Sequence, residues 1–343
     1  MQDSLFDEGP VDEPPVPPSP PRKRGAKVQP AVHDASLVTL ATELPATLRL
    51  GTSSWTYAGW IGTVWDSEYS DPMLSRHGLS AYAQHPLFRT VSLDRSFYQP
   101  LDVAKYAAYA AQVPADFRFV VKAPSRVCDA LVRDEGGRGM QDNPSFLDPD
   151  LALRCYVEPA MEGLRDKLGA LVFQISPLPS HLLGCMPQLI DLLHGMLRTV
   201  RQACDNTLAV EVRDPAWLTP QFTAALKATG VTYCMGLHAK MPRIAEQLPI
   251  LRALWPGPLV CRWNLNPLHG AFGYENARRQ YEPYDRIHDP DPETRSALAK
   301  LIAGVTGAGQ PAYVTLSNKA EGSAPLSVLA LAEAIRELRG GQP

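Results

Sequence analysis

Charged side chains that can bind anions and move protons stand at the ends of several apolar runs in this chain. Lys122 ends one run, Glu211 and Arg213 end another, and Arg262 lies near the end of a third. A guanidinium fork binds phosphate or carboxylate through two hydrogen bonds, and a lysine ammonium adds a point charge. A carboxylate or an amine could exchange protons with a bound molecule. These residue types predict a site for a phosphorylated or carboxylated small molecule, with Glu211, Lys122 and Asp94 in catalytic roles.

Amide and aromatic side chains accompany these charges and complete the predicted binding site. Amides orient a substrate through hydrogen bonds, and aromatic rings stack on a sugar or a base. The expected ligand-binding residues are Arg213, Arg262, Asn318, Gln174, Tyr98, Trp55, Trp60 and Trp217. A structural interpretation stays open, in which Glu211, Arg213 and Lys122 form an ion-pair network and the aromatic rings only pack at the rim. A Schiff-base role for Lys122 is a further alternative.

The sequence gives little support for a metal or a nucleotide cofactor. His238 and His269 are not spaced as metal ligands, and few carboxylates follow the apolar runs. The chain has no P-loop, no G-x-S-x-G and no G-x-G-x-x-G motif. Its six cysteines are spread out without a C-x-x-C pair, which is typical of reduced thiols. We therefore expect no metal, and the cofactor, if one exists, is not identified.

Eight short apolar runs alternate with longer helical patterns, and this alternation predicts the fold. The expected strands are Leu48–Ser54, Arg89–Asp94, Phe117–Ala123, Ala170–Ile175, Thr207–Val212, Val231–Gly236, Pro258–Trp263 and Ala312–Ser317. Continuously apolar strands are buried on both faces, as in parallel sheets. Eight strand–helix repeats predict an α/β fold, a (β/α)8 TIM barrel, with a doubly wound open sheet as the alternative. In a barrel, polar residues at the carboxyl ends of the strands form the active site, and the long connections 124–169 and 264–311 belong to that face.

Overall composition excludes several classes of protein. The 343 residues carry a net charge of −3, which disfavours broad attraction to nucleic acid or to an acidic membrane. No apolar run is long enough to span a bilayer, and the N-terminus lacks the basic start and apolar core of a secretory signal. We expect a cytoplasmic protein that does not bind membranes.

The first 45 residues differ from the rest of the chain. Eight prolines fall within residues 1–30, with acidic residues before the proline-rich run and Arg22–Arg24 after it. We expect residues 1–45 to be a disordered tail and residues 46–340 to be the barrel domain. Within that tail, Gln2, Leu5 and Phe6 match the short peptide with which bacterial DNA-metabolism proteins dock on the sliding clamp. The basic run adds a weak expectation of contact with nucleic acid.

Several motifs, in order, resemble one known family. They are Leu50–Tyr57 with Trp60, Ser96–Tyr98, Phe117–Phe119 through Lys122–Pro124, Leu168–Gly169 through Phe173–Gln174, Val210–Arg213 with Pro215 and Trp217, and Asn318–Gly322 with Ala324 and Pro325. Together they resemble the YecE-like proteins, the domain of unknown function 72 family, over roughly residues 48–335. This resemblance implies a TIM barrel, which agrees with the strand count, and it supplies no reaction.

The chain departs from the usual family pattern at positions that matter for chemistry. Ser92 and Asp94 stand where the family usually has Glu and Asn, and Asn264 lies within a segment where the family has Arg-x-His-Gly. Ser317 replaces the first of an Asn pair, and Ser323 stands where His is common. These changes weaken any acid–base mechanism that uses the family's Glu and His, and they mark a divergent member.

Three functions compete on this sequence, and whether the protein is an enzyme stays undecided. The first is an enzyme or binder of an anionic small molecule at the strand ends. The second is a DNA-metabolism protein tethered to the sliding clamp through its N-terminal peptide. The third is a non-catalytic scaffold that binds a ligand on a barrel.

Overall fold

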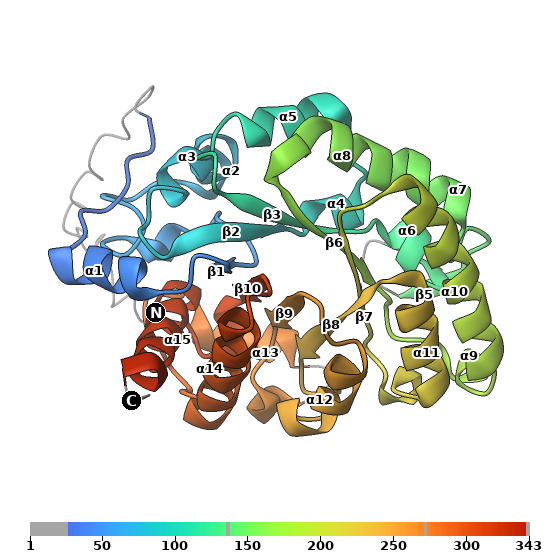
Figure 1. The fold of residues 1–343 in the computed structure, drawn as a ribbon. Helices are drawn as coiled ribbons and strands as arrows, with labels where there is room; N and C mark the ends of the chain where they lie inside the picture. Colours follow the sequence, from blue (N-terminus) through green and yellow to red (C-terminus); the bar gives the residue numbers. More distant parts are fainter. Residues whose placement is uncertain (1–26, 135–137, 271–272, 341–343) are drawn as a thin grey trace, which may run out of the picture.

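A closed barrel of parallel strands forms the centre of the molecule in the computed structural model, which describes residues 27–134, 138–270 and 273–340 (Figure 1). The barrel strands are β1 (Leu48–Thr52), β2 (Phe88–Leu93), β3 (Arg118–Lys122), β6 (Leu168–Gln174), β7 (Thr207–Glu211), β8 (Thr232–Leu237), β9 (Leu259–Trp263) and β10 (Ala312–Leu316). They pair in the order β1-β10-β9-β8-β7-β6-β3-β2, and β1 closes the ring by pairing with both β2 and β10. All eight predicted strands and the (β/α)8 barrel are confirmed, and the open sheet is excluded.

Small side chains fill the inside of the barrel, whereas larger ones pack between strands and helices. The inner cluster consists of Val120, Ala170, Val172, Ala209, Cys234 and Val260, with Tyr313 against it. Strands must also approach closely, and Gly51 on β1 permits this. A Cβ at Gly51 would lie 1.9 Å from the carbonyl oxygen of Thr90 on β2. The closure of the ring between β1 and β2 therefore depends on a residue without a side chain.

Helices surround the barrel and hold the strands in place (Figure 1). The longer ones are α5 (Val103–Ala110), α8 (Glu158–Leu164), α10 (Met186–Ala203), α11 (Pro220–Thr229), α12 (Ile244–Ala253), α14 (Pro292–Gly307) and α15 (Ala324–Gly340). Further helices are α2 (Asp71–His77), α3 (Leu79–Tyr82), α4 (Arg95–Tyr98), α6 (Ser125–Cys128), α7 (Pro149–Ala152) and α9 (Ser180–Leu183). Helix α11 begins as its sequence predicts, with Pro220 in the first turn and the Thr219 hydroxyl accepting from the Phe222 amide at 3.2 Å.

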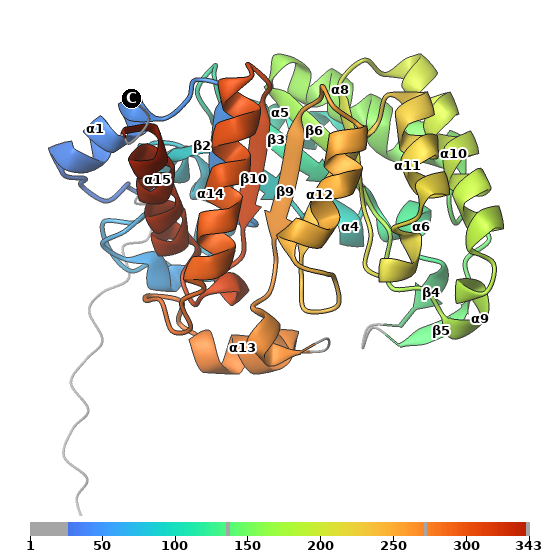
Figure 2. The same cartoon turned by 60° about the horizontal axis from the view of Figure 1, so that its bottom comes forward.

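The two long connections carry extra elements at the carboxyl ends of the strands. The first holds the antiparallel pair β4 (Leu131–Arg133) and β5 (Gly139–Asp142), and the second holds α13 (Tyr274–Tyr281). Figure 2 shows α13 and the β4–β5 pair beyond the end of the barrel toward which β9 and β10 point. The β4–β5 pair and α13 therefore lie at the face where the active sites of such barrels are found.

Part of the segment predicted as a tail is folded. Helix α1 (Ala35–Glu43) lies beside α15 (Figure 1), and its Leu40 and Ala41 are buried. Upstream of it, Pro30 forms a β-bridge with Trp65. The prediction of a disordered tail over residues 1–45 is therefore wrong for residues 27–45. The proline-rich composition of the preceding residues obscured a helix that buries Leu40 and Ala41 and packs against α15.

The structure also bears on the cysteines and on membrane-spanning helices. All six cysteines lie in the described part of the chain and are free thiols. Over residues 27–134, 138–270 and 273–340, no helix combines the length and apolar composition that crossing a bilayer requires.

Candidate functional site

A cavity of about 600 Å³ opens at the carboxyl ends of the barrel strands, where the sequence predicts the site. Strands β2, β3, β6, β7 and β9 end in or lead directly into Asp94, Lys122, Gln174, Arg213 and Arg262, and all five line the cavity. The other lining residues are Ser53, Ser54, Tyr57, Tyr98, Pro177, His238, Lys240, Asn264, Tyr274, Ser317 and Lys319. Parallel strands thus bring together side chains that are far apart in the sequence.

Glu211 lies beneath the cavity and is fully buried. Its Oε1 forms an ion pair with an Arg213 Nη at 2.8 Å and accepts a hydrogen bond from Asn264 Nδ2 at 3.1 Å, and its Oε2 accepts one from an Arg262 Nη at 2.6 Å. Burial alone would raise the pKa of this carboxyl, but Arg213 and Arg262 outweigh burial and lower it. Glu211 is therefore an ionised anchor for two arginines, and the predicted role as a general acid or base does not suit it.

Arg262 also reaches across the barrel to Asp94. One Nη of Arg262 lies 2.5 Å from Asp94 Oδ2, and Asp94 Oδ1 accepts from the Ser92 hydroxyl at 2.5 Å. Burial would lower the pKa of Arg262, but Asp94 and Glu211 outweigh it and raise the pKa. Gln174 Oε1 accepts from both arginines, at 3.0 Å from Arg213 and 3.2 Å from Arg262. Both guanidinium groups are consequently fixed in place and permanently charged.

Gly236 on β8 makes this arrangement possible. Strand β8 lies between β7 and β9, so the Glu211–Arg262 pair must pass over it. A Cβ at Gly236 would lie 3.0 Å from Glu211 Oε1 and 3.3 Å from its Cγ. A side chain at this position would therefore press on the Glu211 carboxylate and force it to shift. The sequence analysis did not assign a role to Gly236, and its signal was a glycine inside an apolar strand.

Lys122 has a different environment from the arginines. It is 9 % exposed, lines the cavity, and places its ammonium 3.6 Å from the centre of the Phe97 ring. Among the described residues, its ammonium forms no ion pair within 4 Å and no hydrogen bond. Burial lowers the pKa of Lys122 to about 8, although Asp94 favours the charged form. The predicted pairing of Lys122 with Glu211 does not occur, so its amine remains available to a ligand.

Neutral polar groups complete the wall of the cavity. Burial, followed by the Arg213 charge, lowers the pKa of His238 to about 4, and its Nδ1 accepts from the Lys240 amide at 3.1 Å. The Nε2 of the neutral ring therefore carries the proton. Burial raises the pKa of Tyr57 to about 12, which keeps its phenol protonated. Both side chains are donors that do not titrate near neutral pH.

Tyr274 is a lining residue that the sequence analysis missed. Its hydroxyl accepts from Arg213 Nη at 3.1 Å, and its ring lies against His238 with a centroid distance of 5.2 Å. It comes from α13, inside a long connection with no strand pattern to mark it. The only available signal was the length of that connection.

Four predicted ligand-binding residues lie outside the cavity. Trp55, Trp60 and Trp217 are 2 %, 1 % and 0 % exposed and pack in the core, so they cannot stack on a ligand. Asn318 is also buried, and its Oδ1 accepts from the Ala324 amide at 2.8 Å and from Trp60 Nε1 at 3.2 Å. It holds the first turn of α15 rather than a substrate. Tyr98, in contrast, lies at the rim and is 84 % exposed.

Two further points concern metal ligands and the N-terminal peptide. Among residues 27–134, 138–270 and 273–340, no group of three or more His, Cys, Asp or Glu side chains could hold a metal ion. The predicted clamp-binding residues Gln2, Leu5 and Phe6 lie outside the described residues.

The fold and the site together define a class of protein: a (β/α)8 barrel with a mixed-charge cavity at the carboxyl ends of its strands. A family model described as "Protein of unknown function DUF72" matches residues 49–342, and the chain belongs to this family. The predicted resemblance is thereby confirmed. A search of curated proteins finds no match to the chain.

Two solved structures show the same architecture. A DUF72 family protein from Enterococcus faecalis V583 is 15 % identical with a TM-score of 0.55, and the match covers 84 % of this chain and 95 % of that one. A DUF72 family protein from Thermotoga maritima MSB8 is 19 % identical with a TM-score of 0.52, covering 83 % and 98 %. At these identities the similarity shows the fold alone.

Proposed function

We propose that the strand-end cavity binds a small anionic molecule, phosphorylated or carboxylated, and that Lys122 contacts the anion. The observation that carries this proposal is a buried lysine that faces the cavity and has no carboxylate partner among the residues that the structure describes. A buried charge is normally paired, because removal from water is costly. An anionic ligand would supply the partner that this chain does not.

The balance of charge around the cavity favours an anion over a cation. Five cationic side chains line it: Lys122, Arg213, Lys240, Arg262 and Lys319. Among the described residues, Asp94 is the one carboxylate on the wall, with Glu211 buried behind it, and both are bound by arginines. The net positive potential attracts a negative ligand.

Some of the lining residues would bind the ligand, and others would transfer protons. Arg213 and Arg262 hold fixed positive charge at the floor, with Glu211 and Gln174 positioning them. Neutral His238 and Tyr57 offer hydrogen bonds that do not depend on charge. A lysine with a pKa of about 8 can give and take a proton near neutral pH, which suits a general acid. Asp94, with its side chain 32 % exposed, is the carboxylate within reach of a ligand.

A thermal-shift screen tests the proposal. The panel holds sugar phosphates, nucleotides and dicarboxylates, with neutral sugars and a polyamine as charge controls. Ligand at about 100 times its Kd stabilises the folded chain by about 2.7 kcal/mol, which is readily measured. We expect a shift from one anionic class in the wild type and its loss in Lys122→Met.

Lys105→Met is the matched control for this screen. Lys105 is exposed on α5 and does not line the cavity, so its loss removes one charge without touching the site. A response that survives in Lys122→Met, or a response to neutral sugars alone, contradicts the proposal. Turnover of the bound ligand would make the protein an enzyme, whereas tight binding without turnover would make it a ligand-binding scaffold.

The N-terminal peptide favours a second function, a tether to the bacterial sliding clamp. The observation is the order Gln2-Asp3-Ser4-Leu5-Phe6, in which two adjacent apolar side chains would enter a pocket on the partner. A titration of purified clamp with the full chain tests this. We expect binding that Leu5→Ala plus Phe6→Ala abolishes, and unchanged binding would exclude the tether.

A further inference from the structure

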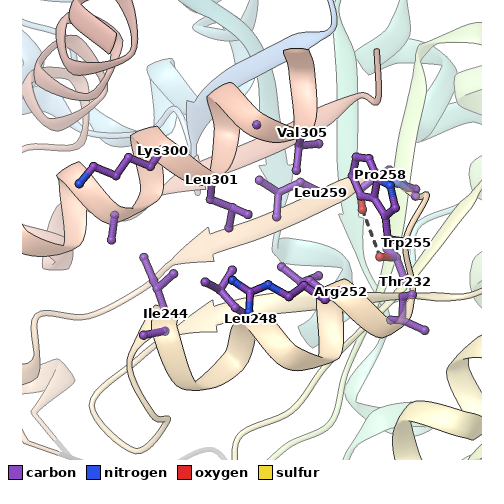
Figure 3. A pocket seen from close by; sticks show the side chains of 16 residues that line it. Thr232, Ile244, Leu248, Arg252, Trp255, Pro258, Leu259, Lys300, Leu301 and Val305 are labelled. Atoms are coloured by element: carbon purple, nitrogen blue, oxygen red, sulfur yellow. Dashed lines mark hydrogen bonds between the residues drawn. The ribbon is translucent and has the colours of Figure 1, made fainter. Parts of the chain in front are cut away.

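An apolar slot lies on the outer side of the barrel, between α12 and α14. It encloses about 680 Å³ and shares no lining residue with the strand-end cavity. Figure 3 shows Leu248 of α12 and Leu301 and Val305 of α14 facing the space between the two helices. Leu259, the first residue of β9, forms part of its floor. Neighbouring barrel helices normally fill such a space with their own side chains.

The polar groups of the slot fall into two sets. Inside, the Thr232 hydroxyl donates to the carbonyl oxygen of Pro258 at 3.1 Å, so this hydroxyl already has an acceptor. Two cations also line the slot, Arg252 on α12 and Lys300 on α14, and both are exposed. Neither side chain has a hydrogen bond or an ion pair to a residue that the structure describes. Figure 3 shows Arg252 lying alongside Leu248, over the apolar interior.

We propose that this slot binds an amphipathic anion, a free carboxylate with an extended hydrocarbon chain. Apolar side chains from both helices would bury the hydrocarbon, which is favourable in proportion to the area removed from water. The carboxylate would be held through charge-assisted hydrogen bonds by the Arg252 guanidinium or by the Lys300 ammonium. Trp255, 47 % exposed at one end of the slot, would be covered by the bound chain.

The volume and the distribution of charge favour this class over others. Ligand cavities commonly measure about 300–1,000 Å³, and this slot falls within that range. None of the described residues that line it is acidic, so an apolar cation would meet two like charges and no partner. A neutral apolar molecule would leave both cations unpaired.

Gly304 offers a direct way to fill the slot without disturbing the fold. It lines the slot from the last turn of α14, and an added Cβ would meet open space. Gly304→Leu therefore places a side chain in the slot and also replaces a poor helix former by a good one. Gly195→Leu is the matched control, since Gly195 lies in α10, has equally open space and is absent from the slot.

Calorimetric titration of the full chain with decanoate tests the site. We expect decanoate to bind the wild type and Gly195→Leu alike, and to bind Gly304→Leu about ten-fold more weakly or not at all. Melting temperatures of both variants should not fall, which shows that they fold. Equal decanoate affinity in Gly304→Leu would overturn the proposal.

A second experiment tests the head group by changing the charge of the protein in one arm and the charge of the ligand in the other. We expect Arg252→Gln plus Lys300→Gln to weaken decanoate about ten-fold, and decylamine not to bind the wild type. Decanol that binds as tightly as decanoate would overturn the role of the two cations. Self-association of the wild type that Gly304→Leu abolishes would instead make the slot an interface between copies of the chain, and would also overturn the proposal.

Discussion

At the scale of single residues, the site depends on a contrast between charges that are paired and one that is not. Glu211 holds Arg213 and Arg262 in a buried network, whereas Lys122 has the Phe97 ring beside its ammonium and no charged partner within 4 Å among the described residues. A buried ion pair adds little net stability but is costly to break from one side. An unpaired buried ammonium is costly as it stands. Removing the charge of Lys122 should therefore raise the free energy of unfolding, whereas removing the charge of Glu211 should lower it.

Replacing Lys122 by Met should stabilise the protein at neutral pH. Burial lowers the pKa of Lys122 from 10.5 to about 8, so its charged form costs free energy in the folded state below pH 8. Removing that charge should raise the free energy of unfolding by roughly 1–3 kcal/mol. Urea denaturation at pH 7 measures this. A loss of stability in Lys122→Met would contradict the account.

The same group predicts how wild-type stability changes in alkaline solution. Between pH 8 and 10.5 the unfolded chain keeps the Lys122 proton while the folded chain has lost it. Wild-type stability relative to Lys122→Met should therefore rise across that range and then level off. A difference in free energy of unfolding between the two proteins that stays constant from pH 7 to pH 10 would show that the pKa of Lys122 is not lowered.

Replacing Glu211 by Gln should have the opposite effect. The substitution leaves Arg213 and Arg262 without their shared counterion in a buried place and should destabilise the fold by about 3–5 kcal/mol. Because Arg213 and Arg262 lower the pKa of Glu211 despite its burial, its contribution is fully present above its ordinary pKa and is lost as pH falls below that. Urea denaturation of both proteins at pH 7 and at pH 4 checks this. A loss below 1 kcal/mol at pH 7 would contradict the network.

At the scale of elements, strand ends were predictable and side-chain directions in loops were not. A parallel barrel places every strand's carboxyl end on one face, so Asp94, Lys122, Gln174 and Arg262 could be assigned to one site from their positions after apolar runs. Trp55 and Trp217 follow strands too, but their loops turn the rings into the core. No periodic pattern in such loops says which way a side chain points, and Tyr274 escaped prediction for the same reason.

The closure of the barrel gives a prediction at this scale. Gly51→Ala would place its Cβ 1.9 Å from the Thr90 carbonyl oxygen, and backbone cannot move aside as a side chain can. We expect β1 and β2 to separate locally and stability to fall by about 3 kcal/mol or more. Gly62→Ala is the comparison, because Gly62 has open space but a φ of +75°, and it should cost only about 1 kcal/mol. Similar losses of stability in Gly51→Ala and Gly62→Ala would contradict the close approach of Gly51 to the Thr90 carbonyl oxygen.

At the scale of the whole molecule, the folded domain begins earlier than its composition indicates. Val28 and Leu40 are buried, and α1 lies against α15. Residues 27–45 therefore pack against the last helix of the barrel domain. Burying each such side chain contributes about 1.5–3 kcal/mol. Removal of residues 1–45 should therefore lower stability by about 3 kcal/mol or more, whereas removal of residues 1–26 should leave it unchanged. Equal stability of the two truncations would show that α1 is dispensable.

The central claim is that Lys122 binds the anion in its protonated form, and a titration over pH tests it most directly. The probe is the dicarboxylate of the panel with the largest thermal shift, because carboxylates stay ionised from about pH 7 to pH 10. Wild-type affinity should be constant below the Lys122 pKa of about 8 and then fall by up to about ten-fold per pH unit. Lys122→Met should bind weakly at every pH. A wild-type affinity that does not change between pH 7 and pH 10 would contradict the assignment of the anion to Lys122.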